Sequence, residues 1–252
     1  MGRVEGKVAI VTGGAQGLGK ADCEALVREG AKVVVTDVKE SEGQATAAEL
    51  NALRPGNAIF LKQDVRDEQR WIEVVAKAVE TFGGLHILVN NAGLVRMGTP
   101  DVVTLDDFRL HNAVMSEGVF LGCKHAIPAM AKSGGGSIIN VSSVASHLGY
   151  PVYFSYSAAK GAVRAMTKSL AVWCQMNKWN IRVNSIHPGA TDTEMVQNSA
   201  RELGVSVDVF RETGPGLGRP EDVANVVLFL ASDESKYLNG AELLLDNALT
   251  IQ

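Results

Sequence analysis

The chain has 252 residues, of which 46% are hydrophobic and 21% are charged, and its net charge is −4. This length and composition fit one globular α/β domain with a large core. The acidic balance argues against nucleic acid as a partner, because nucleic acid usually requires a basic face. No apolar run reaches the roughly 20 residues that span a bilayer, and the first residues lack the pattern of a secretory signal. We therefore expect a cytoplasmic protein without a membrane partner.

Three cysteines, Cys23, Cys123 and Cys174, are spread along the chain. Their spacing predicts neither a metal site nor a disulfide framework. We expect free, buried thiols in a reducing compartment and no bound metal.

Short β-branched runs alternate with longer helical segments. The predicted strands are Lys7 to Thr12, Lys32 to Asp37, Ala58 to Leu61, His86 to Asn90, Ser137 to Ser142, Ile181 to Ile186 and Glu242 to Leu245. The predicted helices cover 17–29, 41–53, 67–82, 104–132, 153–178 and 220–231. Several strands are almost continuously apolar, as strands covered on both faces are. The alternation predicts a single α/β domain, 1–252, with a doubly wound parallel sheet of about seven strands and helices on both faces.

A glycine cluster, TGGAQGLG, follows the first predicted strand and opens the first predicted helix. Glycine at such positions permits a tight turn and lets the backbone approach a pyrophosphate at the helix N-terminus. The candidate dinucleotide-binding residues of this segment are Gly13, Gln16, Gly17, Leu18 and Gly19. The place of the cluster between a strand and a helix indicates a Rossmann-type fold.

The second predicted strand ends in Asp37. A carboxylate there accepts hydrogen bonds from the adenosine ribose hydroxyls and repels a 2′-phosphate. The neighbouring Gln16 and Val38 are not basic, and Lys39 is the nearby candidate for a counter-ion. The sequence therefore favours NAD over NADP. After the third strand, two residues are candidates for contact with the adenine, namely Asp64 and Val65, with a helix N-terminal acid as the alternative reading of Asp64.

Tyr156 is followed four residues later by Lys160, and Ser143 stands thirteen residues before the tyrosine. Positions i and i+4 of a helix share a face, so the phenol and the ammonium point to one side. A tyrosine pKa near ~10 would have to fall by roughly three units before the phenol could act as a base near pH 7. We expect the charge of Lys160 to lower that pKa, and Ser143 to hydrogen-bond a substrate oxygen.

Five motifs stand in order along the chain: TGGAQGLG, Asn90–Asn91–Ala92–Gly93, Ser143, Tyr156-x-x-x-Lys160 and His187–Pro188–Gly189. Together they resemble the short-chain dehydrogenase/reductase family over essentially the whole chain. The resemblance implies that Tyr156 transfers the proton, that Lys160 lowers the pKa of Tyr156 and holds the nicotinamide ribose, and that Ser143 stabilises the reacting oxygen. It also implies that the cofactor is lined by Asn90, Ala92 and Gly93 on the adenosine ribose side and by Pro188, Gly189, Thr191 and Thr193 beside the nicotinamide.

Two positions depart from the family pattern. Met115 stands where relatives usually carry an asparagine that holds a water next to the lysine, and Asn112 or Ser116 could replace that asparagine. Asp246–Asn247–Ala248 stands where relatives often have Asp-Gly-Gly. The first departure concerns the proton relay, and the second concerns the geometry near the C-terminus.

The segment from 193 to 219 is rich in glycine and polar residues, and Gly214, Gly216 and Gly218 would break any helix there. We expect it to form a mobile lid over the site, with an ordinary surface loop as the alternative. The candidate substrate-contacting residues are Val144, Leu148, Tyr150, Tyr153, Met195 and Phe210, which make a mainly apolar pocket. No arginine or lysine stands in 144–155 to hold a carboxylate or a phosphate. We expect the loop residue His147 to be solvated, with polar recognition of the substrate as the alternative.

These features predict an NAD-dependent oxidoreductase that interconverts a secondary alcohol and a ketone on an apolar alicyclic, terpenoid, steroid or aryl frame. One alternative is a 3-oxoacyl-thioester reductase, which more often uses NADP. An alternative of another class is a non-catalytic nucleotide-binding scaffold. The resemblance further implies a homotetramer built on the helices 104–132 and 153–178.

Overall fold

Seven strands form one sheet in the computed structural model, which describes residues 2–212 and 214–252. Residues 1 and 213, which the predicted domain and the predicted lid include, lie outside the described residues. The strands are β1 (Val8–Thr12), β2 (Lys32–Asp37), β3 (Ala58–Lys62), β4 (Ile87–Asn90), β5 (Gly136–Val141), β6 (Ile181–Pro188) and β7 (Glu242–Leu245). All neighbouring strands run parallel, in the order β3-β2-β1-β4-β5-β6-β7. The predicted α/β class and the parallel sheet are confirmed.

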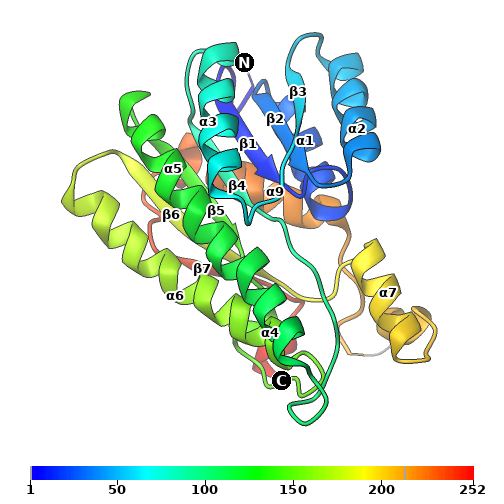
Figure 1. The fold of residues 1–252 in the computed structure, drawn as a ribbon. Helices are drawn as coiled ribbons and strands as arrows, with labels where there is room; N and C mark the ends of the chain where they lie inside the picture. Colours follow the sequence, from blue (N-terminus) through cyan, green and yellow to red (C-terminus); the bar gives the residue numbers. More distant parts are fainter. Residues whose placement is uncertain (1, 213) are drawn as a thin grey trace.

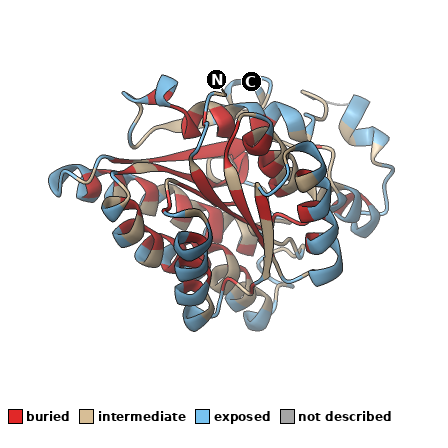
Figure 2. Cartoon of the chain, turned by 90° about the horizontal axis from the view of Figure 1, so that it is seen from above, coloured by how far each residue is buried: buried red, intermediate tan, exposed pale blue. Residues whose placement is uncertain are grey.

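Helices cover both faces of the sheet (Figure 1). One face carries α1 (Gly17–Arg28), α2 (Glu40–Leu53) and α9 (Pro220–Ala231), and the other carries α3 (Glu68–Phe82), α5 (Gly118–Lys132) and α6 (Phe154–Met176). The strands are apolar throughout because both of their faces are covered: every residue of β1 and of β4 is buried. Figure 2 shows this buried layer at the centre of the molecule, with exposed residues on the outer sides of the helices. None of the described helices is both long enough and apolar enough to cross a membrane.

The predicted helix 104–132 is interrupted. The chain forms α4 (Leu105–Asn112), then a π-helical turn over Ala113–Glu117, and then α5. The Gly118 N–H donates to the Ala113 carbonyl, five residues back, so the turn is one residue wider than an α-helical turn. Met115, at the centre of this turn, is fully buried. Such turns are frequent at functional sites.

The strand order reverses between β1 and β4, and at such a point the loops that leave the carboxyl ends of the strands diverge and open a crevice. The segment predicted as a helix-free lid crosses this end of the sheet. The expectation that it contains no helix is wrong, because α7 (Glu194–Glu202) and α8 (Asp208–Glu212) form before the glycines at 214, 216 and 218 (Figure 1).

Candidate active site

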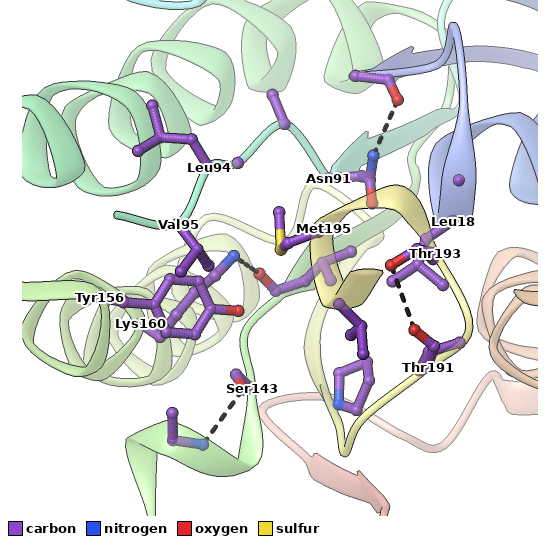
Figure 3. Close-up of a pocket in the computed structure, with 18 of the residues that line it drawn as sticks. Leu18, Asn91, Leu94, Val95, Ser143, Tyr156, Lys160, Thr191, Thr193 and Met195 are labelled. Atoms are coloured by element: carbon purple, nitrogen blue, oxygen red, sulfur yellow. Dashed lines mark hydrogen bonds between the residues drawn. The ribbon is translucent and has the colours of Figure 1, made fainter. Parts of the chain in front are cut away.

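A cavity of about 700 Å³ lies at the carboxyl ends of the strands. It begins at the glycine loop after β1, passes the ends of β2 and β3, and reaches the start of α6 and the segment that contains α7 and α8. Figure 3 shows Leu18 of α1, Asn91 after β4, Ser143 after β5, Tyr156 and Lys160 of α6 and Met195 of α7 around one space. The cavity therefore joins the predicted cofactor residues to the predicted catalytic residues.

The glycine loop after β1 has little room for side chains at its glycine positions. Gly13 has φ +65°, and a Cβ added there would lie 2.9 Å from the Cα of Ala92. A Cβ at Gly19 would lie 2.3 Å from the Gly13 carbonyl oxygen, so Gly19 serves the packing of α1 on the loop and does not itself line the cavity. A Cβ at Gly17, also at positive φ, would project into the space between the loop and Thr193.

The N-terminus of α1 offers its N–H groups to that space. Gln16 precedes the helix and makes no side-chain capping hydrogen bond. The first N–H groups of a helix need an acceptor, and an anion can supply it. An open cradle above Gly17 and an uncapped helix start suit the pyrophosphate of a dinucleotide.

Asp37 is held in place at the end of β2. Its Oδ2 accepts from the Ala15 N–H at 3.1 Å, and its Oδ1 accepts from the Lys39 N–H at 3.0 Å. Both contacts fix the carboxylate in the cavity wall, where its remaining lone pairs can accept the two hydroxyls of a ribose.

The far end of the cavity is lined by residues that follow β3. Asp64 and Val65 both lie in the wall, as their candidate role requires. Arg66 binds both oxygens of Asp64, at 2.9 and 2.5 Å, and this contact lowers the pKa of the Asp64 carboxyl. Gln63 also lines the cavity, although sequence reasoning did not single it out; its buried side-chain amide has no hydrogen-bond partner among the described residues. A buried amide without a partner is costly, and an adenine could supply one.

The structure corrects one assignment next to the glycine loop. Asn90 does not line the cavity, because its amide is buried and donates to Asn140 Oδ1 at 2.9 Å. Its neighbour Asn91 lines the cavity instead and donates to the carbonyls of Thr12 and Gly13. Ala92 and Gly93 lie in the wall as expected.

Ser143, Tyr156 and Lys160 meet at the other end of the cavity (Figure 3). Ser143 follows β5, while Tyr156 and Lys160 lie in the first turns of α6. The Lys160 ammonium donates to the Val141 carbonyl at 2.7 Å and lies 5.6 Å from the centre of the Tyr156 ring. Ser143 and Tyr156 hydrogen-bond through their side chains.

Burial controls the protonation of this group. It raises the pKa of Tyr156 to about 12, against the smaller opposing effect of the hydrogen bond with Ser143. It also lowers the pKa of Lys160 to about 8. Loss of hydration is the largest cause of both shifts. The expected effect of Lys160 on the pKa of Tyr156 stays a prediction.

Comparisons with known proteins agree with this geometry. The family described as short chain dehydrogenase matches residues 7–204. The chain belongs to the short-chain dehydrogenase family. The 3-beta-hydroxysteroid dehydrogenase of Comamonas testosteroni is 44% identical over 98% of this chain and 97% of its own length. The trans-4-hydroxycyclohexanecarboxylate dehydrogenase of Sinomonas cyclohexanicum is 39% identical over 98% of this chain and 94% of its own. The crystal structure of levodione reductase superposes with a TM-score of 0.92 at 30% identity, over 98% of both chains.

Membership of the family makes this protein an oxidoreductase that acts on alcohol groups with a nicotinamide cofactor. The prediction of the family and of the reaction class is confirmed. The cradle above Gly17, the fixed Asp37 carboxylate and the unpartnered Gln63 amide fit such a cofactor.

The two departures from the pattern of short-chain dehydrogenases have structural counterparts. Met115 packs against Gly93, where an added Cβ would lie 3.3 Å from the Met115 sulfur. The amide of Asn112 donates one N–H to the Phe108 carbonyl at 2.9 Å, which ties this side chain to its own helix. Asn247 and Ala248 both have positive φ, +46° and +69°, in the left-handed region that favours glycine. Asn247 also donates to the Pro215 carbonyl and so ties the C-terminal turn to the predicted lid.

A buried polar cluster lies beneath the Ser143 loop of this dehydrogenase. Ser146 Oγ donates to the Ser143 carbonyl at 2.7 Å, and His187 Nδ1 lies 3.0 Å from Ser146 Oγ. His147 Nε2 lies 3.1 Å from His187 Nδ1, so the expectation of a solvated His147 is wrong. Burial lowers the pKa of His187 to about 4, which keeps that imidazole neutral at physiological pH.

The two histidines and Glu242 are close enough to bind a metal ion in principle. However, Arg164 Nε donates to Glu242 Oε2 at 2.7 Å, and Lys168 forms an ion pair with the same carboxylate. Two cations already on the one anionic ligand oppose a third. The cluster is therefore better explained as support for the loop that carries Ser143.

The substrate end of the cavity is largely apolar. Five of the six predicted substrate-contacting residues line it, namely Val144, Tyr150, Tyr153, Met195 and Phe210, whereas Leu148 does not. Sequence reasoning missed Leu94, Val95 and Leu249, which complete the wall. Of these three, only Leu94 and Val95 could have been predicted from the sequence, because they directly follow the Asn90–Gly93 motif. Of the segment beside the nicotinamide, Pro188, Gly189, Thr191 and Thr193 all line the cavity as expected.

Proposed function

We propose that this chain is an NAD-dependent dehydrogenase and ketone reductase for secondary alcohols on an apolar alicyclic, steroid, terpenoid or aryl frame. One observation carries the proposal: Ser143, Tyr156 and Lys160 converge in a largely apolar chamber that is continuous with a groove lined by the glycine loop, Asp37 and Asp64. NAD supplies the hydride chemistry when it is bound. The chain supplies the orientation of the two reactants and the proton at the oxygen.

The roles of the three residues follow from their environment. The Tyr156 hydroxyl gives a proton to a carbonyl oxygen in the reductive direction and takes one from an alcohol in the oxidative direction. Ser143, already hydrogen-bonded to Tyr156, holds the reacting oxygen. Lys160 donates to the Val141 carbonyl and has further N–H groups for the ribose hydroxyls of the cofactor.

The preference for NAD rests on Asp37, whose fixed carboxylate accepts ribose hydroxyls and repels a 2′-phosphate. The other cofactor contacts that we propose are made by the loop from Gly13 to Leu18, by Asp64, Val65, Gln63, Asn91, Ala92 and Gly93, and by the segment from Pro188 to Thr193.

An apolar ring system suits the other end of the chamber. Apart from Lys160, whose ammonium donates to the Val141 carbonyl, the described residues that line this end include no cation; among them are Val144, Tyr150, Tyr153, Met195, Phe210 and Leu249. A carboxylate or phosphate would lose its hydration there without a partner. The names of the steroid and cyclohexane-ring relatives and of levodione reductase support a substrate with a ring frame, although the substrate in the name of the cyclohexane-ring relative carries a carboxylate. We propose that the segment 193–219 forms the lid of this chamber.

We further propose a cytoplasmic homotetramer. Its cysteines are free, which suits a reducing compartment. Large apolar side chains are exposed on α5 and α6, among them Phe120, Phe154, Val172, Trp173 and Met176. An apolar face of this kind marks an interaction site, and a second copy of α5 and α6 would cover it.

The test is a panel of alicyclic, steroid, terpenoid and aryl secondary alcohols, with NADH formation followed by absorbance and NADP run in parallel. We expect turnover with NAD and a clear preference for one ring class. Tyr156→Phe is the matched variant, because it removes one oxygen and keeps the ring: turnover should fall by orders of magnitude while NAD affinity, measured by calorimetry, stays nearly unchanged. Full activity of Tyr156→Phe, or no turnover of any alcohol by an NAD-binding protein, would contradict the proposal.

A further inference from the structure

Three residues from distant parts of the chain meet beside Asp37. Glu194, the first residue of α7, accepts from the Gln16 side-chain amide at 2.7 Å. Lys39, two residues beyond Asp37, donates from its ammonium to Gln16 Oε1 at 2.6 Å. The Lys39 ammonium also lies 3.3 Å from Glu194 Oε2. All three residues line the cavity, and we call them the Gln16–Lys39–Glu194 bridge.

This bridge stands where a 2′-phosphate would need a cation. The Lys39 N–H donates to the Asp37 carboxylate, so the lysine and the ribose-binding group are adjacent. Arg66 is the second basic residue in the wall on this side of the cavity, and it is bound to Asp64 through two side-chain nitrogens. Both nearby cations are therefore paired with carboxylates of the chain itself.

The bridge together with Asp37 favours a cofactor without that phosphate. Asp37 and Glu194 carry one negative charge each and Lys39 carries one positive charge, so these residues together carry a net negative charge. The contacts with Gln16 and Lys39 lower the pKa of the Glu194 carboxyl, which keeps it ionised at neutral pH. A 2′-phosphate would add about two negative charges to this group. Without Glu194, the Lys39 ammonium would be free to pair with the phosphate.

We propose that Glu194 is a determinant of cofactor choice, which excludes NADP by holding the Lys39 ammonium. The inference rests on the proposed preference for NAD and adds a second residue to it, in a helix more than 150 residues away from the end of β2. The pair is half exposed, with 41% of the Lys39 side chain and 51% of the Glu194 side chain accessible. We therefore expect a moderate effect, because exposed ion pairs are individually weak.

The test measures the dissociation constants of NAD and NADP by isothermal titration calorimetry, which needs no substrate. In Glu194→Gln, the amide keeps the size of the side chain and removes its charge. We expect NADP affinity to rise about fivefold and NAD affinity to change less than about twofold. In the Lys39→Met background the same Glu194→Gln change should give a clearly smaller gain in NADP affinity, because no ammonium is released and only the repulsion by Glu194 is lost. Glu202→Gln is the matched control, since it removes the same charge at the other end of α7, outside the cavity wall.

The outcomes separate this inference from the proposed function. A wild-type protein that binds NADP more tightly than NAD would overturn the proposed cofactor. A wild-type preference for NAD, with an unchanged ratio of the two constants in Glu194→Gln, would overturn the role of Glu194 alone. An equal gain in NADP affinity in the Lys39→Met background would also overturn it, because the gain would not depend on the released ammonium.

Discussion

Tyr156 is a buried phenol, and its burial opposes ionisation of the hydroxyl. Burial raises its pKa to about 12, and the Lys160 ammonium donates to a backbone carbonyl. At neutral pH the hydroxyl is therefore protonated, which suits its role as the acid in ketone reduction. In alcohol oxidation the same residue must first lose its proton.

The pH dependence of the two directions should differ accordingly. In oxidation we expect kcat/KM to rise with pH throughout the neutral and alkaline range, by up to about tenfold per pH unit, because the deprotonated fraction of a base increases below its pKa. Reduction should be nearly flat over the same range, because the phenol remains protonated. Initial rates in both directions from acidic to alkaline buffers would check this. An oxidation rate that does not change with pH would contradict it.

Asp22 is a carboxyl group buried in the core, away from the active site. Its side chain is completely buried in α1, neither carboxyl oxygen has a hydrogen-bond partner among the described residues, and burial raises its pKa well above the ordinary value. The folded state therefore retains a proton that the unfolded chain loses at lower pH. The contribution of this residue to stability is present below the pKa of the unfolded state and is lost as the pH rises toward the pKa of the folded state.

We predict that Asp22→Asn removes this dependence. Relative to the wild type, its free energy of unfolding should improve as the pH rises from about 4, by up to about 1.4 kcal/mol per pH unit until the pKa of the folded state is reached. Urea denaturation of both proteins at several pH values measures the difference. A constant difference between them would show that Asp22 does not titrate between the two states.

Sequence reasoning at the residue scale worked where chemistry dictates the residue type. Asp37 and the Tyr156–Lys160 pair were placed in the cavity wall from their positions at a strand end and on a helix face. It failed between Asn90 and Asn91, because both are asparagines at the end of one strand and the partner that buries Asn90, Asn140, lies on another strand. It also missed Gln63, since an unpartnered amide is recognised only in three dimensions.

At the scale of elements, glycine is required where helices pack closely. A Cβ at Gly122 in α5 would lie 2.6 Å from Asn90 Oδ1 and 2.8 Å from the Trp71 ring, whereas a Cβ at Gly161 in α6 would meet no atom within 4 Å. We predict that Gly122→Ala lowers the free energy of unfolding by about 1–3 kcal/mol through overpacking. Gly161→Ala should raise it by about 0.5–1 kcal/mol through helix propensity. Chemical denaturation measures both, and equal effects would contradict the packing argument.

The boundaries of helices and strands were predictable wherever a periodic pattern of apolar residues ended clearly in the sequence. β2, β7 and α9 begin and end where the sequence predicted. The π-helical turn at Ala113–Glu117 was not predicted, because an added residue in a helix leaves the apolar pattern on both sides intact. Helices α7 and α8 were missed for a different reason: the glycines at 214, 216 and 218 were taken to govern a segment whose first half lies before them.

At the scale of the whole molecule, the sheet was predictable because each strand is buried on both faces and each connection contains a helix. The contacts between copies of the chain were not predictable, because the sequence does not distinguish an exposed apolar side chain from a buried one. Trp173 and Met176 illustrate this: both lie on α6 among apolar residues, yet 48% and 76% of them are exposed.

We predict that Met176→Glu weakens the proposed assembly without unfolding the chain, because a charge would be buried at the contact between copies. Size-exclusion chromatography with light scattering would show a smaller species than the wild type. Leu53→Glu is the matched control, since Leu53 is exposed on α2, which covers the opposite face of the sheet from α5 and α6. The same mass for the wild type and Met176→Glu would contradict the proposal that this face forms the contact between copies.

The last turn of the chain has a practical consequence for anyone who expresses this protein. Leu249 lines the cavity, and Asn247 ties the same turn to Pro215. The first described residues lie at the opposite end of the sheet (Figure 1). An affinity tag fused after Gln252 would emerge beside the chamber mouth, and we expect it to raise KM for bulky substrates, whereas a tag before Met1 should leave the kinetics unchanged. Assays of the two fusions, before and after proteolytic removal of the tag, would reveal the difference.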